Sequence, residues 1–174
     1  MLFPLFIVGT LLHFLYDWTG ENRLVARFAA VNESYWEHIK IAFWPLLLYF
    51  CVAGALGGYR LAGFLPAATA ALYAVPVSMI ALVYTYKRVT RRNLLWLDIL
   101  VFLLTMMLSL SVFVLLSREL VPSLLTNILA GVYLLAIVVA FASYTLRPPA
   151  DPDLFVDPLN EKYGLDAHEP HSQR

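Results

Sequence analysis

Ionisable and aromatic side chains gather between residues 13 and 40, in a stretch that joins two hydrophobic segments. This stretch holds four of the twelve acidic residues, two of the four histidines and two of the four tryptophans of the chain. Imidazole and carboxylate groups together can bind a divalent metal ion or act as an acid–base pair. The candidates for such chemistry are His13, Asp17, Glu33, Glu37 and His38 in this stretch and Asp98 further along the chain.

Spacing places some of these groups on shared helix faces. His13 and Asp17 are four residues apart, as are Glu33 and Glu37, and residues at this spacing are neighbours on a helix. We therefore predict a polar cleft in which some residues are catalytic and others bind the ligand. The predicted catalytic residues are Glu37, His38, His13 and Asp98; the predicted ligand-binding residues are Asp17, Asn32, Glu33, Trp36 and Lys40.

Asp98 stands out because it lies inside an otherwise apolar segment. A carboxylate at the centre of a membrane-spanning helix costs about 2.5–3.5 kcal/mol on insertion scales. Such a residue usually faces neighbouring helices and pairs with another polar group, so we expect His13 or Lys40 as its partner.

A purely structural interpretation of the same residues stays open. Glu37 could only cap a helix, Glu33 and Lys40 could be solvated, and His13 could hydrogen-bond a backbone carbonyl. The sequence contains no H-E-x-x-H motif, no E-x-x-H pair and no cysteine cluster that would make a metal site specific. A divalent metal ion is therefore a hypothesis, with His13, Glu37, His38 and Asp98 as candidate ligands.

Composition assigns the whole chain to the membrane proteins. The 174 residues are 61% hydrophobic and 14% charged, and the mean hydropathy is +0.73. A soluble domain is nearer half apolar and a quarter charged. The formal net charge is zero, so we expect no nucleic-acid partner. The single cysteine, Cys51, cannot form an intrachain disulfide.

Five apolar runs are candidates for membrane-spanning helices, each of which needs about 20 residues. We predict an all-α bundle of five spans in residues 1–147, followed by a proline-rich tail in residues 148–174. The expected spans are residues 2–18, 39–59, 61–84, 94–116 and 120–146.

The distribution of lysine and arginine predicts the orientation of this bundle. Ten of the twelve lie in or next to the first loop, the third loop or the tail, and only Arg60 and Arg118 lie on the opposite side. Cytoplasmic loops carry the excess of positive charge. We therefore expect a multi-pass protein of the cell (inner) membrane, with the N-terminus outside and the C-terminus in the cytoplasm.

Two local patterns predict structure in the first loop, which joins the first two expected spans. Apolar residues recur at helical spacing with arginines opposite, which suits a short interfacial helix, although a solvated loop fits as well. The apolar positions are Leu24, Val25, Phe28 and Ala29, and the basic ones are Arg23 and Arg27. Ser34 to Glu37 then matches a capping box at the start of the second span.

The tail and one glycine pair suggest further contacts. Prolines preclude a regular helix in the tail, but apolar residues such as Phe155 give it anchors. We expect residues 152–165 to fold back onto the cytoplasmic face, and residues 168–174 to be disordered. Gly54 and Gly58 form a small-x-x-x-small pattern that could support a homo-oligomer through helix packing.

Three motifs in this order resemble a known family. They are H-F-L-Y-D-W-T-G, V-N-E-S-Y-W-E-H-I-K and, near the end, F-V-D-P-L-N-E-K-Y-G. The chain resembles the DUF6512 group of small prokaryotic membrane proteins of unassigned function. The resemblance implies a five-span inner-membrane protein, supplies no mechanism, and suggests that the tail belongs with the stretch between residues 13 and 40.

The function class that these observations favour is a small membrane protein with a cytoplasm-facing polar cleft. It would bind or process a lipid or another amphipathic ligand, with a metal ion as a possible aid, and the sequence does not decide whether it is an enzyme. One alternative is a small transporter or channel subunit, although the polar residues cluster in one leaflet. Another is a non-catalytic membrane scaffold that docks through its tail.

Overall fold

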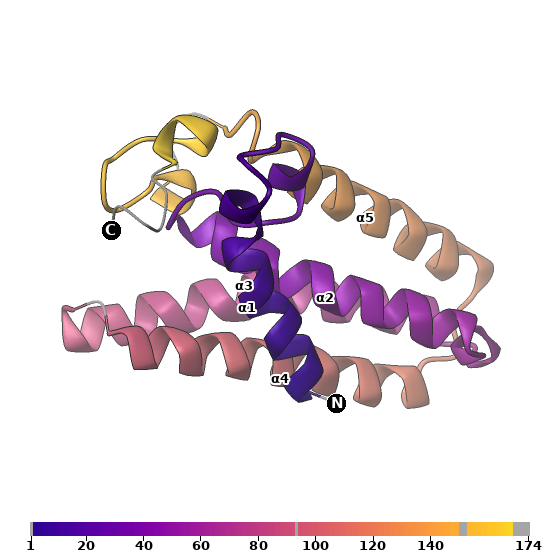
Figure 1. The fold of residues 1–174 in the computed structure, drawn as a ribbon. Coiled ribbons are helices and arrows are strands. Elements are labelled where there is room, and N and C mark those ends of the chain that lie inside the picture. The colour runs from indigo at the N-terminus through magenta and orange to yellow at the C-terminus, as the bar shows by residue number, and fades with distance from the viewer. Residues whose placement is uncertain (1, 93, 150–152, 169–174) are drawn as a thin grey trace. The chain divides into compact units, whose positions relative to one another are not determined.

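The computed structural model describes residues 2–92, 94–149 and 153–168, which fold into α-helices, short 3₁₀ turns and connecting loops (Figure 1). These parts contain no β-strand, only one isolated antiparallel bridge between Val156 and Tyr163. The all-α class predicted from the sequence is confirmed. The five α-helices are α1 (Leu2–Trp18), α2 (Tyr35–Ala55), α3 (Phe64–Thr90), α4 (Leu95–Glu119) and α5 (Leu124–Ser143). The 3₁₀ helices are Val25–Arg27, Gly58–Arg60, Asp153–Phe155 and Gly164–Ala167.

Four of these helices are long and apolar enough to cross a membrane. They are α2, α3, α4 and α5, which contain 21, 27, 25 and 20 residues. The apolar helix α1 has 17 residues and is therefore about 26 Å long, against about 30 Å for the hydrocarbon core of a bilayer. The helices are thus compatible with a multi-pass membrane protein, and a fifth span through α1 stays a prediction.

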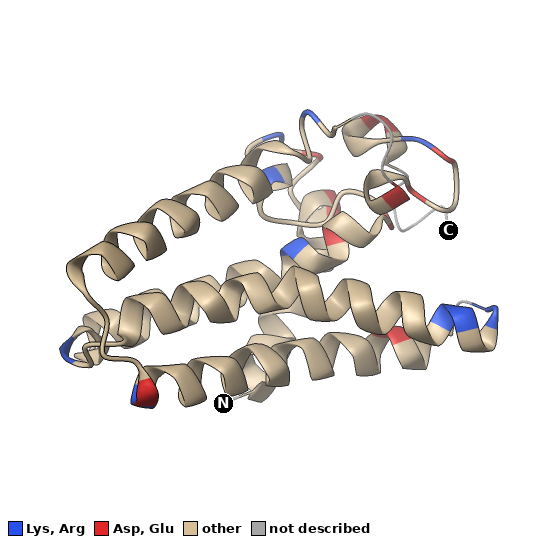
Figure 2. Ribbon diagram, turned by 180° about the vertical axis from the view of Figure 1, so that it is seen from behind, with Lys and Arg blue, Asp and Glu red and all other residues tan. Residues whose placement is uncertain are grey.

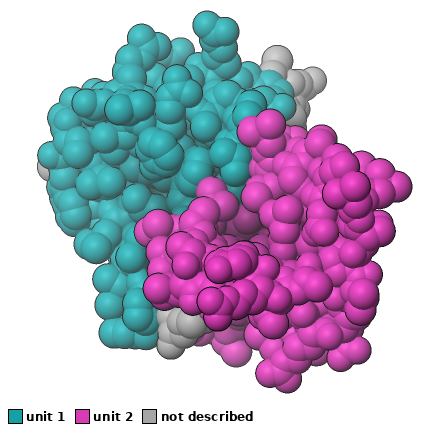
Figure 3. Space-filling model, turned by 90° about the vertical axis from the view of Figure 1, so that its right-hand side faces the viewer, with its two compact units in different colours: residues 1, 3–45, 137–174 teal, residues 2, 46–136 magenta. Residues whose placement is uncertain are grey.

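The chain divides into two compact units (Figure 3), and the divisions fall inside α2 and α5. The first unit contains residues 3–45 and 137–174, so α1, the first loop, the start of α2 and the tail belong together. The second contains residues 46–136. The buried cluster of the first unit consists of Tyr16, Ala26, Ala29 and Val31, with Leu15, Val25, Leu146 and Leu165 packed against it.

The second unit is built around α3 and α4, which lie side by side (Figure 1). Ser109 of α4 donates a hydrogen bond to the Ala71 carbonyl of α3, and Thr69 of α3 donates one to the Ala130 carbonyl of α5. Apart from Asp98, the charged residues of this unit lie at the two ends of the α3–α4 pair (Figure 2). One end carries Arg60, Arg118 and Glu119, and the other carries Lys87, Arg88, Arg91 and Arg92.

The start of α2 contains half of the expected capping box. The Glu37 amide donates to Ser34 Oγ at 3.4 Å, as the motif predicts. The Glu37 carboxylate does not reach back to the Ser34 amide, however, and accepts instead from the Val31 amide at 3.1 Å. The Ser34 amide donates to Asn32 Oδ1 at 2.9 Å. Asn32 therefore takes the role that the capping box assigns to Glu37.

The first loop contains a single 3₁₀ turn, Val25–Arg27, where we expected a short amphipathic helix. Its faces also differ from those predicted. Ala26 and Ala29 are fully buried, whereas Leu24 and Phe28 are largely exposed. The turn is packed through its alanines because these small side chains fit closely against Tyr16 and Val31.

Gly54 and Gly58 both lie under the ring of Phe64 in the same unit. A Cβ atom on Gly58 would lie 2.6 Å from Phe64 Cε2, and one on Gly54 would lie 3.3 Å from Phe64 Cε1. The two glycines thus allow a close approach within the chain. A homo-oligomer through the same pair stays a prediction.

The tail folds onto the N-terminal part of the first unit. It consists of two 3₁₀ turns joined through the Val156–Tyr163 bridge, and Phe155, Asp157 and Ala167 are buried. We expected residues from 168 onward to be disordered, but His168 is held by contacts to Val31 and Asp17. Residues 169–174, and the first residue of the expected fold-back at 152, lie outside the described residues.

Candidate functional site

Two histidines and one glutamate converge in the first unit. His13 comes from α1, Glu33 from the loop before α2, and His38 from the first turns of α2. Glu33 Oε2 lies 3.8 Å from His13 Nε2 and 3.5 Å from His38 Nε2, and one ligand atom of each residue lies within 4.8 Å of the other two. The side chains are 23%, 23% and 31% exposed, so water can reach them.

Hydrogen bonding fixes which nitrogen of His38 faces the glutamate. His38 Nδ1 lies 2.9 Å from the Ser34 carbonyl oxygen, one helical turn back. A carbonyl only accepts, so Nδ1 carries the proton and, in the neutral ring, Nε2 has a bare lone pair. Nε2 lies 3.5 Å from Glu33 Oε2. A cation between the two groups would be coordinated by both of them.

The separations match those of ligands that share one metal ion. Bond lengths of about 2.0–2.2 Å and tetrahedral angles put two ligand atoms roughly 3.4 Å apart. The measured 3.5 Å and 3.8 Å are close to that value. They are also longer than a direct N–H···O hydrogen bond of about 2.7–3.2 Å. Imidazole nitrogens with a carboxylate oxygen suit zinc, iron or manganese as divalent ions.

The tail positions the backbone that carries Glu33. The Glu33 amide donates to Asp157 Oδ2 at 2.9 Å, and Asn32 Nδ2 donates to the Gly164 carbonyl at 2.9 Å. Asp157 is fully buried, and its other oxygen accepts from the Leu159 amide at 2.8 Å. Asn32, expected to bind a ligand, is thus engaged in joining the loop to the tail.

A second histidine–carboxylate group lies where the tail meets α1. His168 Nδ1 is 2.7 Å from the Val31 carbonyl. Its Nε2 is 3.1 Å from Asp17 Oδ1 and 3.7 Å from Glu21 Oε1. The ring also packs edge-on against Tyr16. Both ring nitrogens therefore lie near acceptor oxygens. Asp17 here anchors the tail.

Glu37 and Lys40 form a buried network with Thr145, which follows α5. Lys40 Nζ lies 2.5 Å from Glu37 Oε2, 2.6 Å from Thr145 Oγ1 and 2.7 Å from the Ala26 carbonyl. Thr145 Oγ1 in turn donates to Glu37 Oε1 at 2.7 Å. Both charged side chains are almost inaccessible to water, at 0% and 2% exposure. These contacts favour a structural role for Glu37 and Lys40.

Trp36 lies in an aromatic cluster that joins α2, α5 and the tail. Its ring centroid is 4.4 Å from that of Phe141, 4.8 Å from that of Phe155 and 5.5 Å from that of Tyr144. Such contacts contribute beyond the area that they bury. Trp36 Nε1 has no hydrogen-bond partner among the described residues. The cluster packs the tail against the helices.

Asp98 belongs to the second unit and has a different partner from the one expected. It accepts a short hydrogen bond from the Tyr86 hydroxyl group across the turn between α3 and α4. Lys40, the other expected partner, is paired with Glu37. A role of Asp98 in a site with His13 stays a prediction.

Four residues that shape these groups were not among the site residues predicted from the sequence: Asp157, His168, Thr145 and Tyr86. The tail motif F-V-D-P contained a signal for Asp157, because a carboxylate beside apolar anchors suggests a folded segment. Thr145 and His168 carry no such signal, since their partners lie more than 100 residues away in the chain.

Comparison with known families agrees with the resemblance of the motifs. The family of unknown function DUF6512 matches residues 2–165. The chain belongs to this family. The matched region contains the three residues of the His13–Glu33–His38 group and the tail as far as Leu165. No curated protein and no solved structure matches the chain. Membership of DUF6512 brings no activity with it.

Proposed function

We propose that this protein binds a divalent transition-metal ion through His13, Glu33 and His38, and uses it to process an amphipathic ligand at the membrane boundary. The observation that carries the proposal is the position of His38 Nε2. With Nδ1 committed to Ser34, Nε2 lies 3.5 Å from the Glu33 carboxylate. A metal ion between the two groups would be coordinated by both.

The number of ligands supports chemistry rather than a closed structural site. Structural zinc sites have four protein ligands, whereas catalytic sites have three and leave a position for water or substrate. The partial exposure of all three side chains is consistent with such an open position. A metal-bound water is a nucleophile at neutral pH, so hydrolysis is the reaction class that fits best.

The surroundings favour an amphipathic substrate. His13 lies five residues before the end of α1 at Trp18, or about 7.5 Å along the helix. The preceding turns of α1 expose Phe3, Ile7, Val8 and Leu11. A ligand at His13 would therefore lie where apolar helix surface meets polar loop, with its apolar part along α1.

The orientation that accompanies this proposal puts the site on the cytoplasmic side of the cell membrane. The first loop, the third loop and the tail, together with the helix ends next to them, carry ten of the twelve lysine and arginine residues. The positive-inside rule assigns such loops to the cytoplasm. The N-terminus is then outside, which also requires that α1 spans the bilayer.

Metal analysis of the purified protein tests the proposal. The protein is purified in detergent with an affinity tag free of histidine, dialysed against zinc, iron(II) or manganese, and measured by elemental and native mass spectrometry. We expect one ion per chain in the wild type. Glu33→Gln and His38→Asn should each reduce occupancy at least tenfold, because each leaves only two ligands. Glu119→Gln, an exposed carboxylate of the second unit, is the matched control and should bind like the wild type.

Function is then followed on lipid vesicles. Metal-loaded wild type and Glu33→Gln are incubated with vesicles of total membrane lipid, and products are identified by mass spectrometry. A lipid that the wild type converts and Glu33→Gln does not convert supports the proposal. If no ion binds, or if it binds equally to the variants, the His13–Glu33–His38 group is not a metal site. The scaffold interpretation then gains support.

A further inference from the structure

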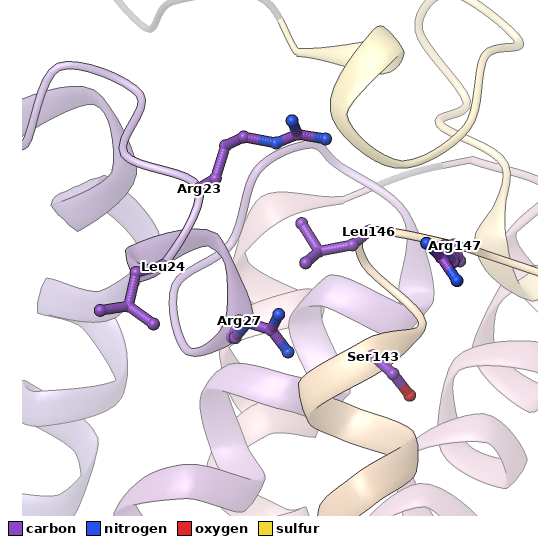
Figure 4. Close-up of a pocket in the computed structure, with 6 residues that line it drawn as sticks. All are labelled: Arg23, Leu24, Arg27, Ser143, Leu146 and Arg147. Carbon is purple, nitrogen blue, oxygen red and sulfur yellow. The ribbon is translucent and has the colours of Figure 1, made fainter.

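A cavity separate from the histidine–glutamate group opens on the first unit, with a volume of about 570 Å³. Three arginines contribute to its wall, and none of its lining residues is acidic. Figure 4 shows the guanidinium groups of these arginines on different sides of Leu146. The lining residues are Arg23, Leu24, Arg27, Ser143, Leu146 and Arg147.

The cavity is formed by two chain segments that other contacts hold in place. Arg27 Nη1 donates to the Ala142 carbonyl at 3.1 Å, which joins the first loop to the end of α5. The Arg27 carbonyl accepts from Trp44 Nε1 at 3.1 Å, and the neighbouring Ala26 carbonyl accepts from Lys40. The segment carrying Arg23 and Arg27 is thus fixed before any ligand arrives, which lowers the entropic cost of binding.

The chemistry of the wall fits one class of ligand. Arginine presents five N–H donors in a planar fork that matches phosphate oxygens, often in pairs. Arg27 uses one of these donors for the Ala142 carbonyl, so others can turn to a ligand. Leu24 and Leu146 supply apolar surface beside the three charges. A wall of this kind suits a phosphate group attached to an apolar body.

We propose that this cavity binds the phosphate group of an amphipathic ligand, through Arg23, Arg27 and Arg147. The ligand class is a phosphate group with net negative charge and no cation attached to it, a chemistry that an anionic lipid headgroup and a free phosphate share. The site goes beyond the proposed metal centre and shares none of its residues. Its binding is expected to persist when the metal ligands are removed.

Native mass spectrometry of the full chain in detergent tests this proposal. Three probes are titrated separately: dioctanoyl phosphatidic acid, dioctanoyl phosphatidylcholine and inorganic phosphate. We expect phosphatidic acid to bind with one site per chain and at least tenfold more tightly than the zwitterionic phosphatidylcholine. Binding should weaken as salt is added, because the contact is between charges. If inorganic phosphate binds as tightly as phosphatidic acid, the site stands and its ligand is a soluble phosphate.

Arginine variants identify the site. Arg23 and Arg147 are exposed, so Arg23→Gln and Arg147→Gln should fold normally and weaken phosphatidic acid binding about tenfold each. Arg118→Gln removes the same charge from the second unit and serves as the matched control. Glu33→Gln lacks a metal ligand and should bind phosphatidic acid like the wild type, which separates the two proposals.

Phosphatidic acid binding by Arg27→Gln is compared with that of the wild type after the melting temperature of the variant has been measured, because Arg27 also holds the first loop. The proposal is overturned if phosphatidic acid binds equally to Arg23→Gln, Arg147→Gln and the wild type. It is also overturned if phosphatidylcholine binds as tightly as phosphatidic acid, or if neither phosphatidic acid nor phosphate binds.

Discussion

Replacement of Lys40 by methionine tests whether the buried network stabilises the first unit. The change keeps the length and apolar stem of the side chain and removes its charge. Three acceptors lose their donor: Glu37 Oε2, Thr145 Oγ1 and the Ala26 carbonyl. Glu37 would then be a carboxylate that retains only the Val31 amide and the Thr145 hydroxyl.

The expected loss follows from these contacts. Breaking a buried ion pair by removing one partner costs about 3–5 kcal/mol, because the other charge stays buried without compensation. For a chain of this size each kcal/mol corresponds to about 2–4 °C in melting temperature. Lys40→Met should therefore melt about 6–20 °C below the wild type. Thr145→Val removes two hydrogen bonds to charged groups and should cost about 3 kcal/mol.

The assay is thermal unfolding of the purified protein in detergent, followed by circular dichroism. Lys162→Met is the matched control, since Lys162 is exposed in the same unit and should change stability by less than about 0.5 kcal/mol. The double variant Glu37→Leu/Lys40→Met should lose less than the two single changes added together, because it leaves no lone buried charge. A Lys40→Met protein that melts within about 2 °C of the wild type would refute the reasoning.

Two further predictions concern the tail and the second unit. Gly164→Ala should release the tail, because Gly164 has φ +54° and a Cβ atom there would lie 2.6 Å from the Thr145 carbonyl oxygen. Limited proteolysis should cut residues 153–168 faster than in the control Gly131→Ala, where a Cβ atom meets nothing within 4 Å. Equal cleavage of the two variants would contradict the docked tail. Tyr86→Phe removes the donor to Asp98 and should lower the free energy of unfolding by about 1.5–3 kcal/mol in the same melting assay. Asp98→Asn should cost less stability in the Tyr86→Phe background than in the wild type. Additive losses would show that the pair does not interact.

Apolar periodicity and length were enough to predict the fold class. Runs of about 20 apolar residues can only satisfy their backbone groups in a membrane as helices or barrels, so helix class follows from composition. The ends of the helices depended on polar neighbours that composition does not resolve. Helix α2 begins at Tyr35, where the Ser34–Glu37 motif indicated a helix start, because Asn32 and Ser34 cap it. The span of residues 39–59, which was based on apolar residues, begins four residues later.

The tail was predictable only in part. Its apolar residues indicated that it would not be disordered throughout, but not what it would contact. Its contacts with Asn32 and Glu33 span 132 and 124 residues of sequence, and no local spacing encodes a pairing of that range. Asp98 is the opposite case. Its partner Tyr86 is only 12 residues away, across the short connection between two antiparallel helices, and this spacing could have indicated the pair.

Glu33 and Glu37 show how the position of a helix start decides the chemistry of a polar stretch. Their spacing of four residues predicts a shared helix face, but α2 begins between them, at Tyr35. Glu33 therefore belongs to a loop and faces His13 and His38, where water can reach it. Glu37 faces the interior and neutralises Lys40. Of two identical residues, the one outside the helix lies beside two histidines, and the one inside has a buried lysine as its partner.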